Sequence, residues 1–224
     1  MNFNYLNSRL KSVKIGFSTL ALAMLALTAS AQQQQEEHKN PNVRLGQKAL
    51  LDGDFKSAVT HLQKALPAEA NDPNVLYLLG YSQFQSTDFK KAADTFGKVV
   101  ALDAKNANAL YYKAKANNTL AVEKDSKLTV AQKEQLLQSV VADYTKAIAI
   151  NASDAKLYQN RAVAYRDLGI LKGTAGAAGY NKQIATDAYT KAVADYEKVL
   201  SYDANRKDIQ TELKKAKVYR DLLK

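Results

Sequence analysis

Between residues 39 and 206, apolar residues recur at three- and four-residue spacing in paired blocks. In residues 44–72 one block, RLGQKALL, is followed by the polar DGD and then by a second block, FKSAVTHLQKAL. This spacing places the apolar side chains on one face of an α-helix. The pattern therefore predicts pairs of amphipathic helices joined by short turns.

The same pattern returns after 34 residues, because residues 44–72 align with residues 78–106 without a gap. Two further copies are stretched by insertions at 121–134 and 171–188. The four units span residues 39–72, 73–106, 107–154 and 155–206. A helix pair repeated in tandem predicts an all-α solenoid, in which each repeat buries its apolar face against its neighbours.

Short polar side chains mark the starts of the second helices. Asp54 and Asp88 occupy equivalent positions in the first two units. Each can accept a hydrogen bond from an amide that the helix leaves free. In the third unit, Thr129 and Gln132 have the spacing of a capping box, which predicts a lengthened second helix.

These units resemble tetratricopeptide repeats (TPRs). In that family a small residue stands where the paired helices approach, and a bulky residue fills the space beside it. The small column here is Gly46, Gly80, Ala114 and Ala162, facing Ala58, Ala92, Val140 and Ala192; the bulky column is Leu62, Phe96, Tyr144 and Tyr196. The resemblance implies a right-handed superhelical solenoid of antiparallel helix pairs, and residues 207–224 suit a capping helix at its end.

One column departs from the family pattern. The aliphatic position of the first helix, Leu45 and Leu79 in the first two units, is Lys113 and Arg161 in the other two. We therefore expect less regular packing in the second pair of repeats.

The resemblance also implies a binding surface, because the first helices of such proteins line a concave groove that holds a peptide or helix of a partner. The groove-facing columns here are Tyr77, Tyr81, Phe84, Gln85, Tyr111, Lys115, Asn118, Lys156, Gln159 and Arg166. Aromatic rings offer large contact area, and Lys or Arg can hold an acidic group. The alternative is that the tyrosines belong to the core between repeats.

The first 31 residues have the pattern of a cleavable signal peptide. A basic start precedes an uncharged apolar run at 15–28, and Ala29-Ser30-Ala31 is the small-x-small motif cut after Ala31. An uncleaved membrane anchor is the alternative. Residues 32–38 lack apolar side chains to bury, which predicts a disordered lead-in. We expect the mature protein in the periplasm or outside the cell.

The charge favours acidic partners without requiring them. The whole chain carries 32 basic and 22 acidic side chains, and removing the signal with its three basic residues leaves 29 − 22, or +7. Such a surface can attract acidic proteins or anionic lipid, or can simply be solvated. Export argues against nucleic acid as a partner.

Two hypotheses follow from these patterns. The first is a protein-interaction scaffold in a cell-envelope complex. The second is a membrane-surface or glycan-associated accessory protein, acting by peripheral contact through its basic C-terminal helix. The basic residues of that helix are Lys214, Lys215, Lys217, Arg220 and Lys224.

No pattern indicates catalysis, a cofactor or a metal site. The glycine-rich stretch LKGTAGAAGYNK at 171–182 follows a predicted helix and lacks GK[ST], so we interpret it as an inserted turn and not as a phosphate loop. His38 stands beside Glu36 and Glu37, which is only a weak hint of a metal site, His61 has no second ligand at helical spacing, and cysteine is absent. The sequence predicts a non-catalytic protein without cofactors, and leaves open whether the two insertions contact partners.

Overall fold

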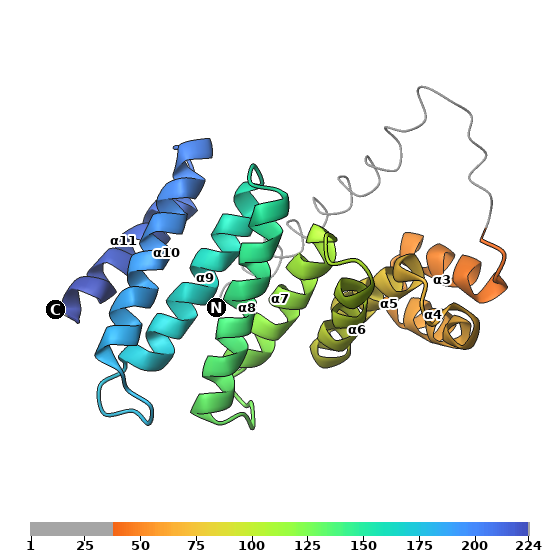
Figure 1. Ribbon diagram of the computed structural model, residues 1–224, viewed down its shortest axis with the longest axis horizontal. Coiled ribbons are helices and arrows are strands. Elements are labelled where there is room, and N and C mark those ends of the chain that lie inside the picture. The colour runs from red at the N-terminus through yellow and green to blue at the C-terminus, as the bar shows by residue number, and fades with distance from the viewer. Residues whose placement is uncertain (1–37, 224) are drawn as a thin grey trace, which may run out of the picture. The chain divides into compact units, whose positions relative to one another are not determined.

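The computed structural model describes residues 38–223, and this range forms nine α-helices. The expected signal peptide lies outside the described residues. The helices are α3 (Pro41–Leu51), α4 (Phe55–Glu69), α5 (Pro73–Gln85), α6 (Phe89–Leu102), α7 (Ala107–Val122), α8 (Val130–Ile150), α9 (Ala155–Gly173), α10 (Lys182–Tyr202) and α11 (Lys207–Leu222). Figure 1 shows them side by side in chain order. The prediction of an all-α solenoid of helix pairs is confirmed. None of the described helices is long and apolar enough to cross a membrane.

Polar side chains start eight of these nine helices by accepting a backbone hydrogen bond. Asp54 and Asp88 accept from the amides three residues on, at 3.0 and 3.4 Å. Thr129 and Gln132 form both bonds of a capping box, at 3.2 and 2.8 Å. The predicted caps are confirmed, and each such cap stabilises a helix by about 1 kcal/mol.

The small residues of the first helices allow the bulky residues of the second helices to fill the space between them. A Cβ atom on Gly46 would stand 2.6 Å from Cγ of Leu62, and one on Gly80 would stand 3.1 Å from Cζ of Phe96. The bulky column, Leu62, Phe96, Tyr144 and Tyr196, is at most 1 % exposed. The predicted pairing of small and large positions is therefore the core of each repeat.

Buried ion pairs replace the aliphatic column in the second pair of repeats. Nζ of Lys113 donates to Asp143 at 2.8 Å, and the guanidinium of Arg161 donates to both carboxylate oxygens of Asp195 at 2.7 and 2.8 Å. Asp143 and Asp195 are 4 % and 5 % exposed. The departure from the family pattern therefore places an ion pair at this column of the second pair of repeats.

The glycine stretch holds the inserted turn that the sequence predicted, and the rest of each insertion lengthens the helices beside it. The lengthened helices leave only 123–129 between α7 and α8, and 174–181 between α9 and α10. Their ends form a hydrophobic cluster of Ala121, Leu137, Leu168 and Ala188, against which Leu136, Leu171 and Ile184 pack. Gly173 is the last residue of α9, and the other two glycines of the stretch, Gly176 and Gly179, lie in the turn.

The two insertions contact each other at one edge of the solenoid. Nζ of Lys172 pairs with Glu134 at 2.8 Å. Gly179 has a φ of +81°, and a Cβ atom there would stand 2.7 Å from Cγ1 of Val130. Glycine therefore serves both the left-handed backbone and the close approach at this position.

Helix α11 closes the end of the solenoid, as the sequence predicted. Ile209 and Ala216 are buried in the same cluster as Ala192, Tyr196 and Val199 of α10. The apolar face of α10 is thus covered, which is the role of a capping helix.

Candidate binding surface on the first helices

The ten side chains predicted to line a groove lie on three successive first helices, α5, α7 and α9. We refer to these ten positions as the first-helix surface. They are Tyr77, Tyr81, Phe84 and Gln85 on α5, Tyr111, Lys115 and Asn118 on α7, and Lys156, Gln159 and Arg166 on α9.

An aromatic cluster joins α5 to α7, and Tyr112 lies at its centre. The ring of Tyr112 stacks on Phe96, with centroids 5.4 Å apart, and meets Tyr81 and Phe84 edge to face, also at 5.4 Å. Sequence reasoning missed Tyr112 because it assigned only Tyr111 of this doublet to the surface. The adjacent pair of tyrosines was the signal that a second ring packs toward the preceding repeat.

The α5 and α7 rings of the first-helix surface are half-buried. Tyr77, Tyr81 and Phe84 pack against the core cluster of the second repeat, and Tyr111 packs against that of the third. Burial raises the pKa of Tyr77 to about 12. These rings therefore contribute to the core between repeats while keeping part of their area at the surface.

Lys115 is a cation held by aromatic rings. Its Nζ atom lies 5.5 Å from the ring centroid of Phe84 and 5.7 Å from that of Tyr111. Desolvation by burial lowers the pKa of Lys115. Within residues 38–223, no carboxylate forms an ion pair with this ammonium group. A negative charge brought to this position would therefore be stabilised.

The first helices as a set are strongly basic. Helices α3, α5, α7 and α9 together carry eight Lys or Arg residues and one acidic residue, Asp167. On α7 and α9, ion pairs hold Lys113, Arg161, Arg166 and Lys172. No acidic side chain on α5 or α7 competes for Lys115.

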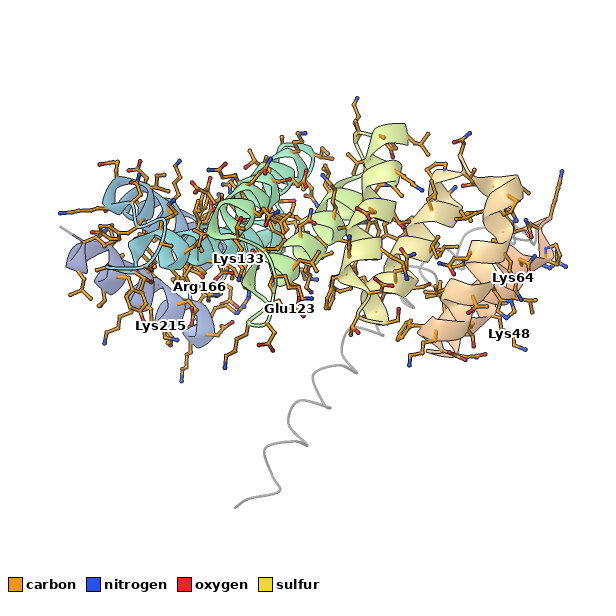
Figure 2. The ribbon with its side chains drawn as sticks, turned by 90° about the horizontal axis from the view of Figure 1, so that it is seen from below. Lys48, Lys64, Glu123, Lys133, Arg166 and Lys215 are labelled. Carbon is orange, nitrogen blue, oxygen red and sulfur yellow. The ribbon has the colours of Figure 1, made fainter. Side chains whose placement is uncertain are left out.

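Arg166 differs from Lys115 because its charge is already compensated. Its guanidinium pairs with Asp167 at 2.8 Å and with Glu212 of α11 at 2.9 Å. Glu212 also accepts from Lys215 at 2.9 Å, and Figure 2 shows Arg166 and Lys215 near each other. Arg166 thus fastens the capping helix to α9.

Two amides of the first-helix surface are also engaged inside the protein. Nδ2 of Asn118 donates to Asp167 at 3.1 Å, and Oε1 of Gln159 accepts from Arg206 at 3.2 Å. Lys156 is exposed. The charge of this surface that lies beside aromatic area without an ion pair is therefore that of Lys115 on α7, between rings of α5 and α7.

Comparisons with known proteins agree with this architecture. The family model of the anaphase-promoting complex, cyclosome, subunit 3 matches residues 52–122, about a third of the chain. The crystal structure of MamA protein is similar over 80 % of this chain and 90 % of its own, at 22 % identity and a TM-score of 0.52. This chain has the fold of a TPR solenoid.

Two further solved structures resemble this TPR solenoid at lower scores. MamA 41-end from Desulfovibrio magneticus RS-1 is 17 % identical, with 80 % of this chain and 93 % of that chain covered and a TM-score of 0.49. A thermophilic TPR protein of Thermus thermophilus is 18 % identical, with 79 % and 97 % covered and a TM-score of 0.46. No curated protein matches the sequence.

Within the TPR solenoid, the residues that set the fold are separate from those at the surface. The small and bulky columns are buried. Lys115 belongs to neither column. The packing columns of the fold therefore do not account for Lys115, which has no ion pair among the described residues and lies over two aromatic rings.

Proposed function

We propose that this protein is a non-catalytic interaction scaffold that binds an extended segment or helix of a partner protein on the first-helix surface, at α5 and α7. The observation that carries the proposal is Lys115, an ammonium group packed on Phe84 and Tyr111 without an acidic partner among the described residues. A scaffold that kept this charge only for solubility would leave it in water.

The same observation defines the chemistry of the partner segment. It carries an acidic side chain, which pairs with Lys115, next to apolar or aromatic side chains, which cover the exposed parts of Tyr77, Tyr81 and Tyr111. Partly desolvated charge pairs are stronger than those in water, and half-buried rings lose little conformational entropy on binding. The excess of basic residues on the first helices adds long-range attraction for an acidic partner.

We further propose that the scaffold works in the cell envelope after export. The support is the pattern of residues 1–31, whose basic start, apolar run and Ala29-Ser30-Ala31 motif are typical of a cleaved signal peptide. N-terminal sequencing of the protein from its own cells tests this: the mature chain should begin at Gln32. Cytoplasmic protein with an intact first segment would contradict the location and leave the binding surface unaffected.

The alternative function, peripheral membrane or glycan contact through α11, has weaker support. Three of its described cations are paired with acids: Lys215 with Glu212, Lys217 with Glu197 and Arg220 with Asp221. Compensated charges contribute little attraction to an anionic surface.

A peptide-display selection tests the binding proposal directly. The purified full chain is presented with a random library of 12-residue peptides, and the enriched peptides are measured by calorimetry. We expect enrichment of Asp or Glu flanked by apolar residues, with Kd weakened about tenfold or more by Lys115→Met, since 1.4 kcal/mol corresponds to a factor of ten. Lys64→Met, an exposed lysine on α4, is the matched control and should leave Kd unchanged.

Two results would contradict the proposal. One is a set of peptides without acidic enrichment. The other is binding that Lys115→Met and Lys64→Met weaken equally, since that outcome would indicate attraction to net charge and not to one surface.

A further inference from the structure

The first-helix surface continues onto α3. Gln47 of α3 stands where Tyr81 stands on α5 and Lys115 on α7, because these parts of the units align at an offset of 34 residues. By the same offset, Leu51 of α3 stands where Gln85 stands on α5. Helix α5 contacts both α3 and α7. These five residues therefore run across three adjacent helices, and we refer to them as the α3–α7 row.

The α3 end of this row offers apolar and aromatic area. Leu51 is 71 % exposed. Phe55, the first residue of α4, meets the ring of Tyr81 edge to face, with centroids 6.5 Å apart. Both rings are half-buried. Apolar area of this kind is covered favourably by another apolar side chain.

A hollow of about 360 Å³ adjoins the same end of the row, between the turn that joins α3 to α4 and the turn that joins α5 to α6. Phe55 and Gln85 line it, together with one acid, Asp54, and one base, Lys56. Because the two charges are of opposite sign, the lining favours an uncharged side chain over a charged one.

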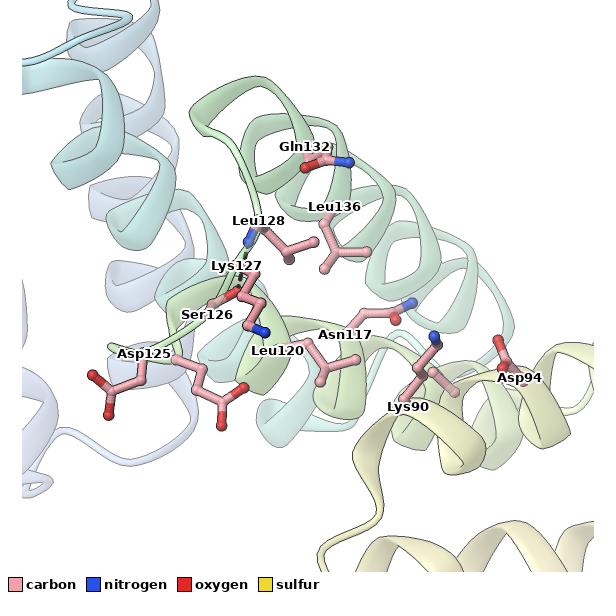
Figure 3. A pocket seen from close by; sticks show the side chains of 12 residues that line it. Lys90, Asp94, Asn117, Leu120, Asp125, Ser126, Lys127, Leu128, Gln132 and Leu136 are labelled. Atoms are coloured by element: carbon pink, nitrogen blue, oxygen red, sulfur yellow. Dashed lines mark hydrogen bonds between the residues drawn. The ribbon is translucent and has the colours of Figure 1, made fainter.

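The hollow between α6, α7 and α8, of about 530 Å³, is a contrast. Acidic and basic side chains surround it, as Figure 3 shows. The lining has three carboxylates and two ammonium groups, which belong to Asp94, Glu123, Asp125, Lys90 and Lys127. This mixture indicates no single class of occupant, and the hollow is not continuous with the residues of the α3–α7 row.

Two exposed amides favour an extended occupant along the row. They belong to Gln47 and Gln85, and Nε2 of Gln85 donates to the hydroxyl of Tyr81 at 2.6 Å. An extended segment has backbone N–H and C=O groups that can bond such amides, whereas a helix bonds most of its own backbone groups internally.

The length of the row predicts a spacing in the occupant. Packed helices lie about 8–10 Å apart between axes, so α3 and α7, two steps apart, are separated by about 16–20 Å. An extended chain rises about 3.3 Å per residue and crosses this distance in about five or six residues. A helix, which rises about 1.5 Å per residue, would need about twice that number.

We propose that the α3 end of the row holds an apolar side chain of the same partner segment whose acidic side chain pairs with Lys115. The segment lies extended across α3, α5 and α7, and its apolar residue stands about five or six positions from the acidic one. This inference rests on the proposed function, and it adds Leu51 as a second anchor.

A positional analysis of selected peptides tests this inference. Peptides of 12 residues selected on the full chain are aligned on their acidic residue, and we expect an apolar residue about five or six positions away, on one fixed side. Leu51→Ser should weaken the Kd of such a peptide about tenfold. Leu51→Ala should act in the same direction, by less. Both variants should keep the circular dichroism of the wild type, because Leu51 is exposed at the end of its helix.

A matched control is Leu222→Ser, which changes a leucine that is 76 % exposed on α11 and should leave Kd unchanged. Replacement of the apolar residue of the peptide by Ala should remove most of the effect of Leu51→Ser. Peptides that respond to Lys115→Met and not to Leu51→Ser, or that show only a helical spacing, would overturn this inference and leave the proposed function intact. Peptides that do not respond to Lys115→Met, or a library that yields no binders, would overturn both.

Discussion

The first and second pairs of repeats solve the same packing problem with different chemistry. At the aligned positions, the first two repeats have Leu45 and Leu79 on the first helix and His61 and Thr95 on the second, where the hydroxyl of Thr95 donates to Gln83 at 2.7 Å. The last two place Lys113 against Asp143 and Arg161 against Asp195, with the carboxylates buried and the cations half-buried. One backbone arrangement thus accepts a leucine without a charged partner or a member of an ion pair at equivalent positions.

The two solutions differ in what they require. An apolar contact tolerates change in either partner, because neither side chain needs the other to be satisfied. A buried ion pair demands both members, since the charge left behind is desolvated and unpaired. The second pair of repeats should therefore be the half of the molecule that is more sensitive to single substitutions at this column.

Removal of one acid from the second half has the largest expected effect. Asp195→Ala leaves the guanidinium of Arg161 without its bidentate partner, and we expect the free energy of unfolding to fall by about 3 kcal/mol or more. Urea denaturation measures it. Asp187→Ala, an exposed acid on the same helix, is the control and should cost less than about 0.5 kcal/mol. Equal losses in both variants would refute the difference between the halves.

A smaller loss of stability is expected when a methyl group is added where two helices of the first half approach closely. Gly46→Ala forces its new methyl group against Leu62 and should cost about 1–3 kcal/mol. In Gly97→Ala the new methyl group has only Cε of Lys113, at 4.0 Å, within reach, so this variant should gain up to about 1 kcal/mol from helix propensity. Thermal unfolding of both variants distinguishes crowding from a general effect of alanine.

Replacing the ion pair of the third repeat with the residues of the second should leave the free energy of unfolding nearly unchanged. The double variant Lys113→Leu/Asp143→Thr introduces the Leu79 and Thr95 chemistry of the second repeat into the third. Because buried ion pairs are often replaceable by apolar contacts without loss, we expect a change within about 1 kcal/mol, although Lys113→Leu alone strands the buried Asp143 carboxylate. Additive losses in the double variant would show that the third repeat needs the ion pair itself.

The smallest expected effect on the free energy of unfolding comes from Lys115, which lies on α7, next to the second repeat. Its pKa is lowered in the folded state by desolvation, so folding of the charged form is disfavoured below that pKa. The penalty disappears as pH rises through the folded pKa toward the ordinary value of 10.5. The unfolding free energy of the wild type should therefore rise relative to Lys115→Met between pH 8 and pH 11. A constant difference would mean that Lys115 is fully solvated.

Local signals in the sequence predicted much of this fold. The caps at Asp54 and Thr129, and the alternation of Gly46 with Leu62, act over one helix pair, so repeated spacing is enough to find them. The ion pairs were harder to predict from the sequence, because Lys113 and Asp143 lie 30 residues apart. A signal existed: both columns change together, to Lys or Arg in one and to Asp in the other.

The candidate site was less predictable for a similar reason. The sequence predicted Arg166 and Lys115 as equivalent cations of one surface. Glu212 of α11, 46 residues from Arg166, pairs with Arg166 and not with Lys115. The position of the insertions was predictable from repeat alignment, but the cluster in which Leu137 and Leu168 meet joins two repeats and was not. Long-range partners decide which surface charges remain available.

A double-mutant cycle by calorimetry tests the central claim most directly. An acidic peptide selected on the wild-type chain is compared with its Glu→Gln counterpart, each against wild type and Lys115→Met. The account predicts that either single change weakens Kd about tenfold and that the second adds little, giving a coupling of about 1.4 kcal/mol. Independent, additive effects of the two changes would contradict a direct contact between the acidic side chain and Lys115.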